Sequence, residues 1–234
     1  MKIYIPCSNQ YHNLIYPYSV FFNKYWKDQE VTILCYDKPD ITLPNNFSLL
    51  SIGKQVQDRT RFLAPLFDFF TNVCKDDYFI FSLEDMFLSD YVNKDKIAKL
   101  EKEIKEGRAD KAVLHFYNEG QVFDIGNDIV ELKQDIHYRT SIHPAIWTRK
   151  YFLKHLRPTM NIWEFETQHH KTKNDGAKII FLKEQLNPNV LFWPMNIYCQ
   201  GKFLSHEFYT VPDATNNGLA HEEDVQVLKD LLKT

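Results

Sequence analysis

Glycine, excess positive charge and long apolar runs are all scarce in this chain, and each scarcity excludes a class of protein. Only 7 of the 234 residues are glycine while aromatic residues reach 15%, which favours a densely packed domain over a flexible or repetitive one. The net charge is -3, so no overall positive field exists to hold a nucleic-acid backbone. No apolar run approaches the length of a membrane span, and the amino terminus lacks a signal-peptide pattern. We therefore expect a cytoplasmic protein that has no membrane span and does not bind nucleic acid directly.

The sequence motifs of several enzyme classes are missing as well. The four cysteines are scattered without a Cys-x-x-Cys pair, which disfavours a zinc site and favours buried free thiols. No GxSxG segment frames a nucleophilic serine. Neither GxGxxG nor GxxxxGK[ST] occurs, so dinucleotide oxidoreductases and P-loop phosphotransferases lack their usual support.

The most informative segment present is YFIFSLEDMFL, residues 78–88. An aromatic and β-branched run of this kind predicts a central strand of an α/β sheet, and it stops on Glu84 and Asp85. Ligands of open α/β sheets bind outside the carboxyl ends of the strands. An acidic pair at that place suits a hard divalent cation with phosphate oxygens, although an acidic turn that faces water is an equal alternative.

The remaining patterns alternate between strands and helices, as in a single α/β domain with parallel pairing and right-handed crossovers. Strands are predicted at residues 2–6, 31–36, 47–52, 78–83, 112–117, 192–198 and 202–204, with a hairpin at 122–132. Helices are predicted at residues 14–26, 61–74, 93–106, 145–156 and 222–232.

A second cluster of candidate residues, Trp-Glu-Phe-Glu at 163–166, follows Pro158 at a predicted helix start. Trp163 and Phe165 could form an apolar wall beside a sugar ring while Glu164 or Glu166 takes a proton from an attacking hydroxyl. The helix dipole would keep such a carboxylate ionised, which slightly favours the earlier Glu164. On a helix the two glutamates diverge, so only one should reach an acceptor. By sequence alone, a helix start with acidic residues and a buried Trp163 is the more probable interpretation.

The order of these segments resembles the GT-A glycosyltransferases, in particular the small nucleotide-sugar-dependent enzymes of bacterial, phage and large-virus glycan pathways. The segment IFSLEDMFL resembles their acidic DxD-type motif, HPAIWTRKYFLKHLRPTMNIWEFE their acceptor region, and Gly201-Lys202-Phe203 a late motif. The resemblance implies one GT-A-like (Rossmann-like) α/β domain over residues 1–234, whose mostly parallel central sheet is flanked by helices. It also implies a nucleotide-sugar half of about residues 1–90, an acceptor half of about 91–212 and a terminal helix of about 222–232.

The resemblance further implies roles for individual residues. Because Met86 stands where a second carboxylate of a DxD motif would be, Asp85 is the expected ligand of Mn²⁺ or Mg²⁺, and Glu84 is expected to reach ribose or sugar hydroxyls. His206 is a further candidate ligand. The other expected donor-binding residues are Pro6, Ser8, Asp37, Arg59, Arg61 and Lys202; the expected acceptor-binding residues are Trp163 and His143.

The implied activity is transfer of a sugar from a UDP- or GDP-sugar to a glycan or another hydroxyl acceptor, with a divalent cation and inversion at the anomeric carbon. A sugar-nucleotide pyrophosphorylase is one alternative, although the loop at residues 7–13 has neither glycine nor a strong cation. A non-catalytic glycan-binding domain is the other, which the aromatic content permits.

Overall fold

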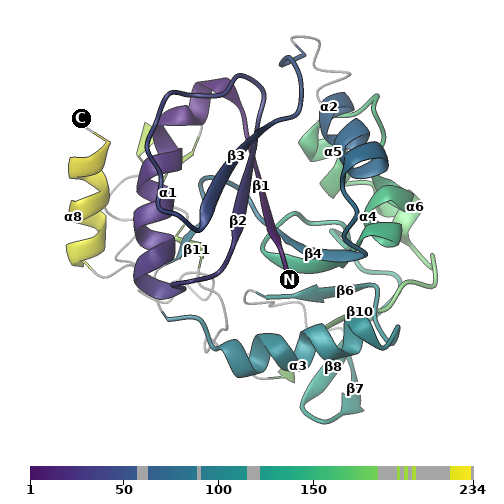
Figure 1. Cartoon of the computed structure of the whole chain (residues 1–234). Helices are drawn as coiled ribbons and strands as arrows, with labels where there is room; N and C mark the ends of the chain where they lie inside the picture. Colours follow the sequence, from purple (N-terminus) through teal and green to yellow (C-terminus); the bar gives the residue numbers. More distant parts are fainter. Residues whose placement is uncertain are drawn as a thin grey trace.

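The protein folds around one large mixed sheet, seen in a computed structural model that describes residues 1–56, 63–88, 91–114, 122–183, 194–195, 198–199, 202–203 and 222–232 (Figure 1). The large sheet contains β1 (Ile3–Cys7), β2 (Val31–Cys35), β3 (Phe47–Ser51), β4 (Tyr78–Phe81), β6 (Lys111–Val113), β7 (Val122–Gly126), β8 (Ile129–Leu132), β9 (Ala145–Thr148) and β10 (Ile179–Leu182). Two small ladders contain β5 (Phe87–Leu88) with β11 (Pro194–Met195), and β12 (Tyr198–Cys199) with β13 (Lys202–Phe203).

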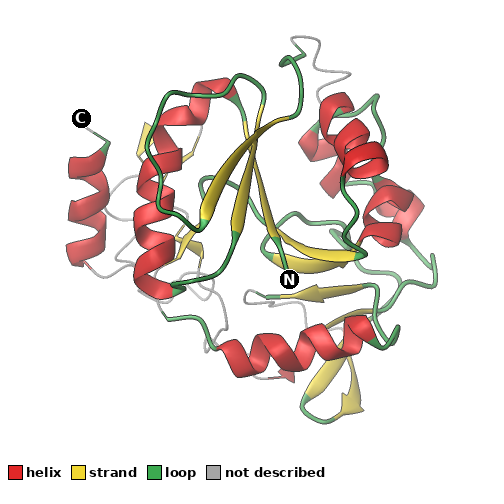
Figure 2. Ribbon diagram, in the orientation of Figure 1, coloured by secondary structure: helices red, strands yellow, loops and turns green. Residues whose placement is uncertain are grey.

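Helices cover both faces of the large sheet (Figure 2). They are η1 (Asn9–Tyr11), α1 (His12–Tyr25), α2 (Ala64–Asp68), the π-helical η3 (Phe69–Val73), α3 (Lys94–Lys105), α4 (Arg149–His155), α5 (Ile162–Glu166), α6 (His169–Thr172) and α8 (Glu222–Leu231). Buried residues of α1, α3 and α8 share one core cluster, and those of α2, η3, α4 and α5 share the other. This three-layer arrangement confirms the α/β fold class that the sequence predicts.

The strand order is β3-β2-β1-β4-β9-β6-β10-β8-β7. Strands β1 to β4 pair in parallel, whereas β9 is antiparallel to both of its neighbours, β4 and β6. The chain leaves β1 for β2 on one side and later returns to β4 on the other, so the connections reverse direction beside β1. In open α/β sheets such a reversal opens a crevice at the carboxyl ends of the strands, where ligands bind.

Residues 145–156 correct the sequence prediction, which made them one helix. Ala145–Thr148 is instead strand β9, and the helix α4 begins only at Arg149. Ala145, Ile146 and Trp147 are fully buried between β4 and β6, and Thr148 caps α4 by accepting a hydrogen bond from the Tyr151 amide at 3.2 Å. Tertiary burial outweighs helical spacing here, because a short apolar run fits a buried strand equally well.

Helix α8 packs beside α1 although the two are far apart in sequence (Figure 1). Leu228 is completely buried, and the carboxylate of Asp224 accepts hydrogen bonds from Lys24 Nζ at 2.5 Å and from the Tyr25 hydroxyl. The late strands predicted at 192–198 and 202–204 are present at 194–195, 198–199 and 202–203, and the rest of those ranges lies outside the described residues.

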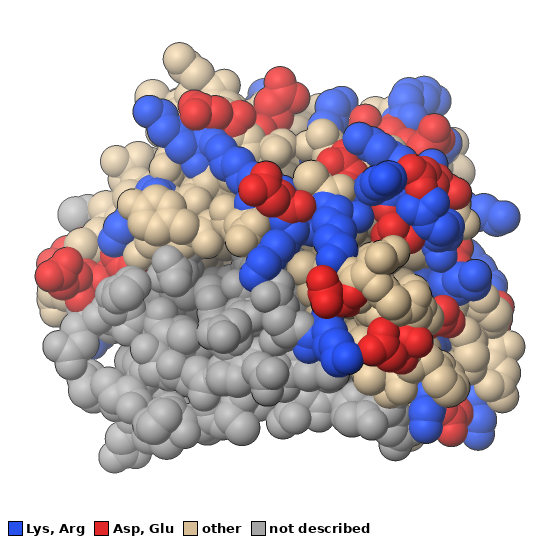
Figure 3. Space-filling view, turned by 90° about the horizontal axis from the view of Figure 1, so that it is seen from below, with Lys and Arg blue, Asp and Glu red and all other residues tan. Residues whose placement is uncertain are grey.

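The surface that includes α3 carries charges of both signs close together (Figure 3). Lys105 pairs with Glu101 and Arg108 pairs with Glu103 on the exposed face, while Ile97, Leu100 and Ile104 are buried. This pattern is typical of an amphipathic helix with one solvated face, and α3 confirms the helix predicted at residues 93–106. In the part of the chain that the structure describes, no helix is both long and apolar enough to cross a membrane.

Phe152 joins strands β4 and β9 to helices η3 and α5, so we expect its loss to be costly. The centroid of its ring lies within 5.4 Å of the ring centroids of Phe70, Phe79, Phe81, Trp147 and Phe165. Replacing Phe152 with Ala should lower the free energy of unfolding by about 3–5 kcal/mol, because it removes buried area and leaves a cavity. Denaturant titration by circular dichroism measures this change.

The matched control is Phe123→Ala on the outer strand β7, where the side chain is 55% exposed. It should change the free energy of unfolding by less than about 1 kcal/mol. Equal losses in the two variants would mean that the aromatic cluster around Phe152 does not dominate the stability of this face.

Candidate functional site

The two adjacent carboxylates lie in a tight turn just beyond β4. The turn runs from Leu83 to Met86 and is closed by a hydrogen bond from the Met86 amide to the Leu83 carbonyl, at 3.2 Å. Phe79, Ile80 and Phe81 are buried and Met86 is almost completely buried, so the chain must reverse at the edge of the sheet. Glu84 and Asp85 are thereby held at the carboxyl end of β4, next to the carboxyl end of β1, as the sequence predicts.

Asp85 is only partly exposed, and its Oδ1 atom is buried without a hydrogen-bond partner among the described residues. Desolvation raises the pKa of Asp85, and the negative charge of Glu166 raises it further. Charges must be close to interact in this way, so the acidic segments at residues 84–85 and 164–166 lie near each other in the fold. A buried carboxylate oxygen that lacks a partner is costly, and a bound ligand would relieve that cost.

Glu84, like Asp85, is only partly exposed. Desolvation raises its pKa, and the charge of Asp85 adds to the effect. Glu84 in turn raises the pKa values of the Tyr18 and Tyr36 hydroxyls and of the Cys7 thiol, each of which burial raises first. Strands β1, β2 and β4 and helix α1 therefore converge on the carboxyl of Glu84.

Several buried polar atoms at this edge lack partners. Among the described residues, eight buried side-chain atoms have no hydrogen-bond partner, and four of them lie around this crevice. They are Ser8 Oγ, His12 Nε2, Tyr18 Oη and Asp85 Oδ1. Buried polar groups are normally hydrogen-bonded, so such a concentration indicates a site that a polar ligand completes.

The loops after β1 and β2 are joined to each other. The Asp37 amide donates to Asn9 Oδ1 at 3.1 Å, and Asn9 Nδ2 donates back to the Asp37 carboxylate. Gln55 Oε1 accepts a hydrogen bond from the Asn9 amide at 3.0 Å. Pro6 is half-buried, Ser8 is 7% exposed and Asp37 is exposed. The structure thus brings Pro6, Ser8 and Asp37 to the same edge as Glu84.

The two glutamates of helix α5 have different environments. Glu164 is exposed and belongs to a capping box: its Oε2 accepts from the Asn161 amide at 2.7 Å, and its own amide donates to Asn161 Oδ1. Glu166 is half-buried, and its Oε1 accepts from the Ile142 amide at 2.9 Å. Desolvation raises the pKa of Glu166, and hydrogen bonds from Ile142 and Ser141 together with the charge of Lys111 oppose this shift.

This geometry favours Glu166 as the base, whereas the sequence slightly favours Glu164. The helix dipole also stabilises a carboxylate that only caps its own helix, and Glu164 is such a capping residue. Glu166 is the glutamate that interacts with Asp85.

The two aromatic residues of α5 also differ in their exposure to solvent. Trp163 is 65% exposed, so it is not the buried core residue that the more conservative interpretation of the sequence proposed. Phe165 is 1% exposed and packs against Trp147 and Phe152, so it cannot form an apolar wall beside a ligand. Trp163 and Glu166 are three residues apart on one helix and therefore share a face.

His143 lies just before β9. Because β9 is antiparallel to β4, its start is at the edge where β4 ends. His143 keeps an exposed surface, while the protein around it desolvates the ring and the charge of Lys111 acts in the same direction; together they lower the pKa of His143 to about 4. The imidazole is therefore neutral at neutral pH.

The oxygen ligands present fit one part of a divalent-cation site. Asp85 offers a carboxylate oxygen that has no partner in the described part of the chain, the kind of ligand that Mg²⁺ and Mn²⁺ accept together with phosphate oxygens and water. No group of three or more His, Cys, Asp or Glu side chains that could hold a metal ion occurs among the residues that the structure describes. Arg59, Arg61 and His206 lie outside the described residues, as does the side chain of Lys202.

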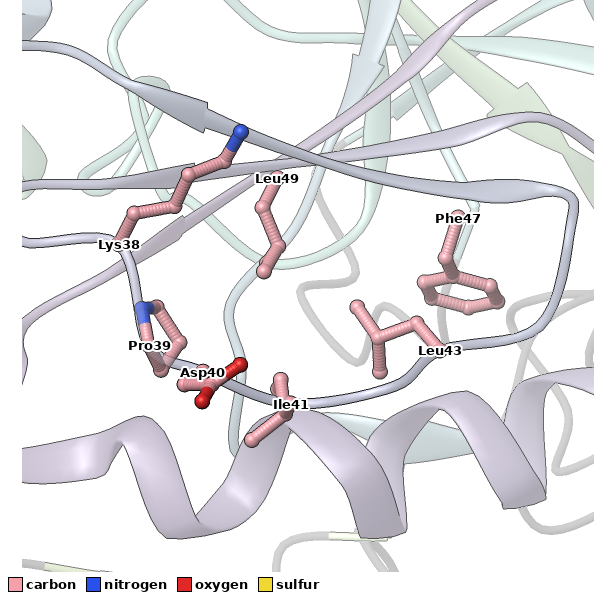
Figure 4. Close-up of a pocket in the computed structure, with 7 residues that line it drawn as sticks. All are labelled: Lys38, Pro39, Asp40, Ile41, Leu43, Phe47 and Leu49. Atoms are coloured by element: carbon pink, nitrogen blue, oxygen red, sulfur yellow. The ribbon is translucent and has the colours of Figure 1, made fainter.

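A separate pocket of about 330 Å³ lies at the opposite margin of the parallel strands, beside β3 (Figure 4). It is lined by Lys38, Pro39, Asp40, Ile41, Leu43, Phe47 and Leu49. None of the predicted site residues lines it. Strands β2 and β1 separate β3 from β4, so this pocket is distinct from the acidic turn that holds Asp85.

No protein-family profile matches the chain, and no curated protein sequence does. Solved structures do. The crystal structure of S. aureus TarS residues 1–349 aligns with 83% of this chain at 13% identity and a TM-score of 0.47, and the chain spans 60% of that structure's length. Galactosyltransferase LgtC, solved with donor and acceptor sugar analogues, aligns over 100% of this chain and 95% of its own, at 10% identity and a TM-score of 0.51.

GalNAc-T7, solved with UDP, GalNAc and Mn²⁺, aligns over 99% of this chain and 49% of its own. The identity is 12% and the TM-score is 0.52. At such identities the likeness establishes the fold alone. The likeness to LgtC and GalNAc-T7, whose TM-scores exceed 0.5, confirms the GT-A, Rossmann-like fold that the motifs resemble.

Tyr18, His12 and Lys111 escaped the sequence interpretation. Tyr18 belongs to a helix whose apolar spacing reads as core, His12 lies in the predicted loop at residues 7–13, and Lys111 stands in a short run that reads as an ordinary strand. In the structure Glu84 acts on Tyr18, Asp37 on His12 and Glu166 on Lys111, and these interactions join segments that are distant in the sequence.

Asp85→Asn should weaken Mn²⁺-dependent binding of UDP or GDP by about 10–100-fold, because the amide oxygen is a poorer cation ligand than the carboxylate. Glu84→Gln should weaken the same binding less, because we assign Glu84 to hydroxyl groups. Calorimetry with and without Mn²⁺ measures both. The reverse ranking would exchange the two roles, and unchanged cation-dependent affinity in Asp85→Asn would remove Asp85 from the metal.

Proposed function

We propose that the protein is a glycosyltransferase that moves a sugar from a nucleotide-diphosphate sugar to a hydroxyl group, with a divalent cation and inversion at the anomeric carbon. One observation carries the proposal: the charge of Glu166, at the end of α5, acts on Asp85, which lies just beyond β4 at the carboxyl edge of the parallel strands. A donor that lies between them would have a cation ligand on one side and a base on the other.

The donor would occupy the crevice between β1 and β4. Its base and ribose would lie near Ser8 and Asp37, and Glu84 would contact hydroxyl groups. Ser8 Oγ and Tyr18 Oη, which have no hydrogen-bond partner within the described ranges, supply hydrogen-bonding capacity at the same edge. A UDP- or GDP-sugar fits this set, because its hydroxyl, base and phosphate groups are all polar.

Asp85 would hold Mn²⁺ or Mg²⁺, which when bound neutralises charge on the departing nucleotide diphosphate. Glu166 would take the proton from the acceptor hydroxyl as that oxygen forms its bond to the anomeric carbon. The bond from that carbon to the diphosphate oxygen breaks, and the nucleotide diphosphate leaves with the electron pair. Attack from the face opposite the leaving group inverts the anomeric centre.

The acceptor would bind on the α5 side of the crevice. Trp163 offers an exposed aromatic face one helical turn from Glu166, and such faces pack against sugar rings. His143 lies at the same edge and is neutral, so it can donate or accept a hydrogen bond.

The test of the function is a panel of nucleotide sugars incubated with the purified protein, Mn²⁺ and simple glycan acceptors. We expect slow release of nucleoside diphosphate from one donor class and faster release with an acceptor. Formation of nucleoside triphosphate from pyrophosphate and the donor would instead identify a pyrophosphorylase. Glycan binding without any turnover would identify a binding domain.

Changing Glu166 to Gln should lower kcat by about 10²–10⁴-fold, the usual contribution of a general base. Donor affinity should stay within about twofold, since the loss lies in the transition state. Steady-state kinetics with calorimetry separates the two quantities.

Glu164→Gln is the matched control on the same helix. It keeps an amide oxygen that can accept from the Asn161 amide, so kcat should change less than about threefold. A large loss in Glu164→Gln with full activity in Glu166→Gln would return the base to Glu164.

A further inference from the structure

The side chain of Lys111 is buried in the large sheet. It is 2% exposed, and in the described part of the chain no acidic side chain forms an ion pair with its Nζ. The amine lies 4.1 Å from the centre of the Trp147 ring and donates to the Arg139 carbonyl at 3.1 Å and the Ser141 carbonyl at 2.7 Å. A hydrophobic side chain would fill this space at a lower desolvation cost, so the sheet alone does not require an amine.

Those two carbonyls belong to the segment that holds Glu166. Within residues 139–142, the Ile142 amide donates to Glu166 Oε1 at 2.9 Å. The Thr140 hydroxyl donates to the Phe165 carbonyl at 2.7 Å, which fixes the end of α5. A continuous chain of hydrogen bonds therefore runs from Lys111 through this segment to the carboxylate of Glu166.

Electrostatic interactions also link Lys111 and Glu166. Desolvation lowers the pKa of Lys111 to about 7, and the negative charge of Glu166 opposes the shift. Lys111 in turn acts to lower the pKa of Glu166 after burial raises it. The two groups are thus electrostatic neighbours, although no direct bond joins them in the structure.

We propose that Lys111 is a positioning residue for the proposed transfer reaction: by holding the carbonyls of Arg139 and Ser141 it fixes the Ile142 amide, and with it the orientation of Glu166. The expected effect of Lys111 on kcat rests on the proposed function, whereas its expected effect on the Ile142 amide does not. Lys111 touches neither donor nor acceptor.

A double-mutant cycle tests the kinetic consequence. Lys111→Met should lower kcat by about 10–10²-fold while the donor KM stays within about twofold, because only the orientation of the base changes. Combined with Glu166→Gln it should add less than about threefold to the loss, since both changes remove one function. A wild-type kcat in Lys111→Met, or losses that multiply in the double variant, would overturn the proposal.

Lys178→Met is the matched control, because Lys178 precedes the adjacent strand β10 and its side chain is exposed. It should leave kcat and KM unchanged. If Lys111→Met does not fold cooperatively, Lys111→Gln replaces it in the same cycle, because Gln retains one donor group.

Amide hydrogen exchange tests the structural consequence without any activity. Lys111→Met should raise the exchange rate of the Ile142 amide by about tenfold or more, while the Ile180 amide in β10 and all amides of Lys178→Met stay unchanged. Unchanged exchange at Ile142 would refute the positioning role even in an active enzyme. If the wild-type protein is inactive but Lys111→Met still increases exchange at the Ile142 amide, only the proposed function is refuted.

Discussion

Burial of strand β4 is the constraint on which the candidate site depends. Phe79, Ile80 and Phe81 lie in the sheet between β1 and β9, and Phe87 and Leu88 are buried immediately afterwards. Between these two apolar runs the chain has to turn at the sheet edge, and the polar residues of the turn are Glu84 and Asp85. The hydrophobic residues therefore determine where the acidic pair lies, and they hold it in surroundings that raise both pKa values.

The opposite side of the crevice depends on β9. This strand runs against β4, so the loop before it reaches the same edge as the acidic turn. Residues of that loop hold Glu166, and Lys111 on β6 holds the loop. Glu166 acts on Asp85 because the antiparallel strand β9 is inserted between β4 and β6, which is a property of topology and not of any local motif.

The parts of the structure that the sequence predicts are those governed by local pattern. The run ending at Phe81, the amphipathic helix α3 and the terminal helix α8 follow from hydrophobic periodicity. The prediction failed at Ala145–Thr148, where a buried strand and a helix share one apolar pattern. The choice between Glu164 and Glu166 stays a prediction, although the pattern Asn161-x-x-Glu164 is a capping-box signature that local reasoning can recognise. Lys111 could not be found, since its significance lies in contacts with segments distant in the sequence.

The most direct test of the site is a structure of the protein with UDP or GDP and Mn²⁺ bound. We expect the diphosphate at the carboxyl ends of β1 and β4, with the cation on Asp85 and with the carboxylate of Glu166 free of metal and facing the side of Trp163. A nucleotide seated in the pocket beside β3, or a cation held by Glu166 and not by Asp85, would contradict this assignment of the donor, metal and base positions.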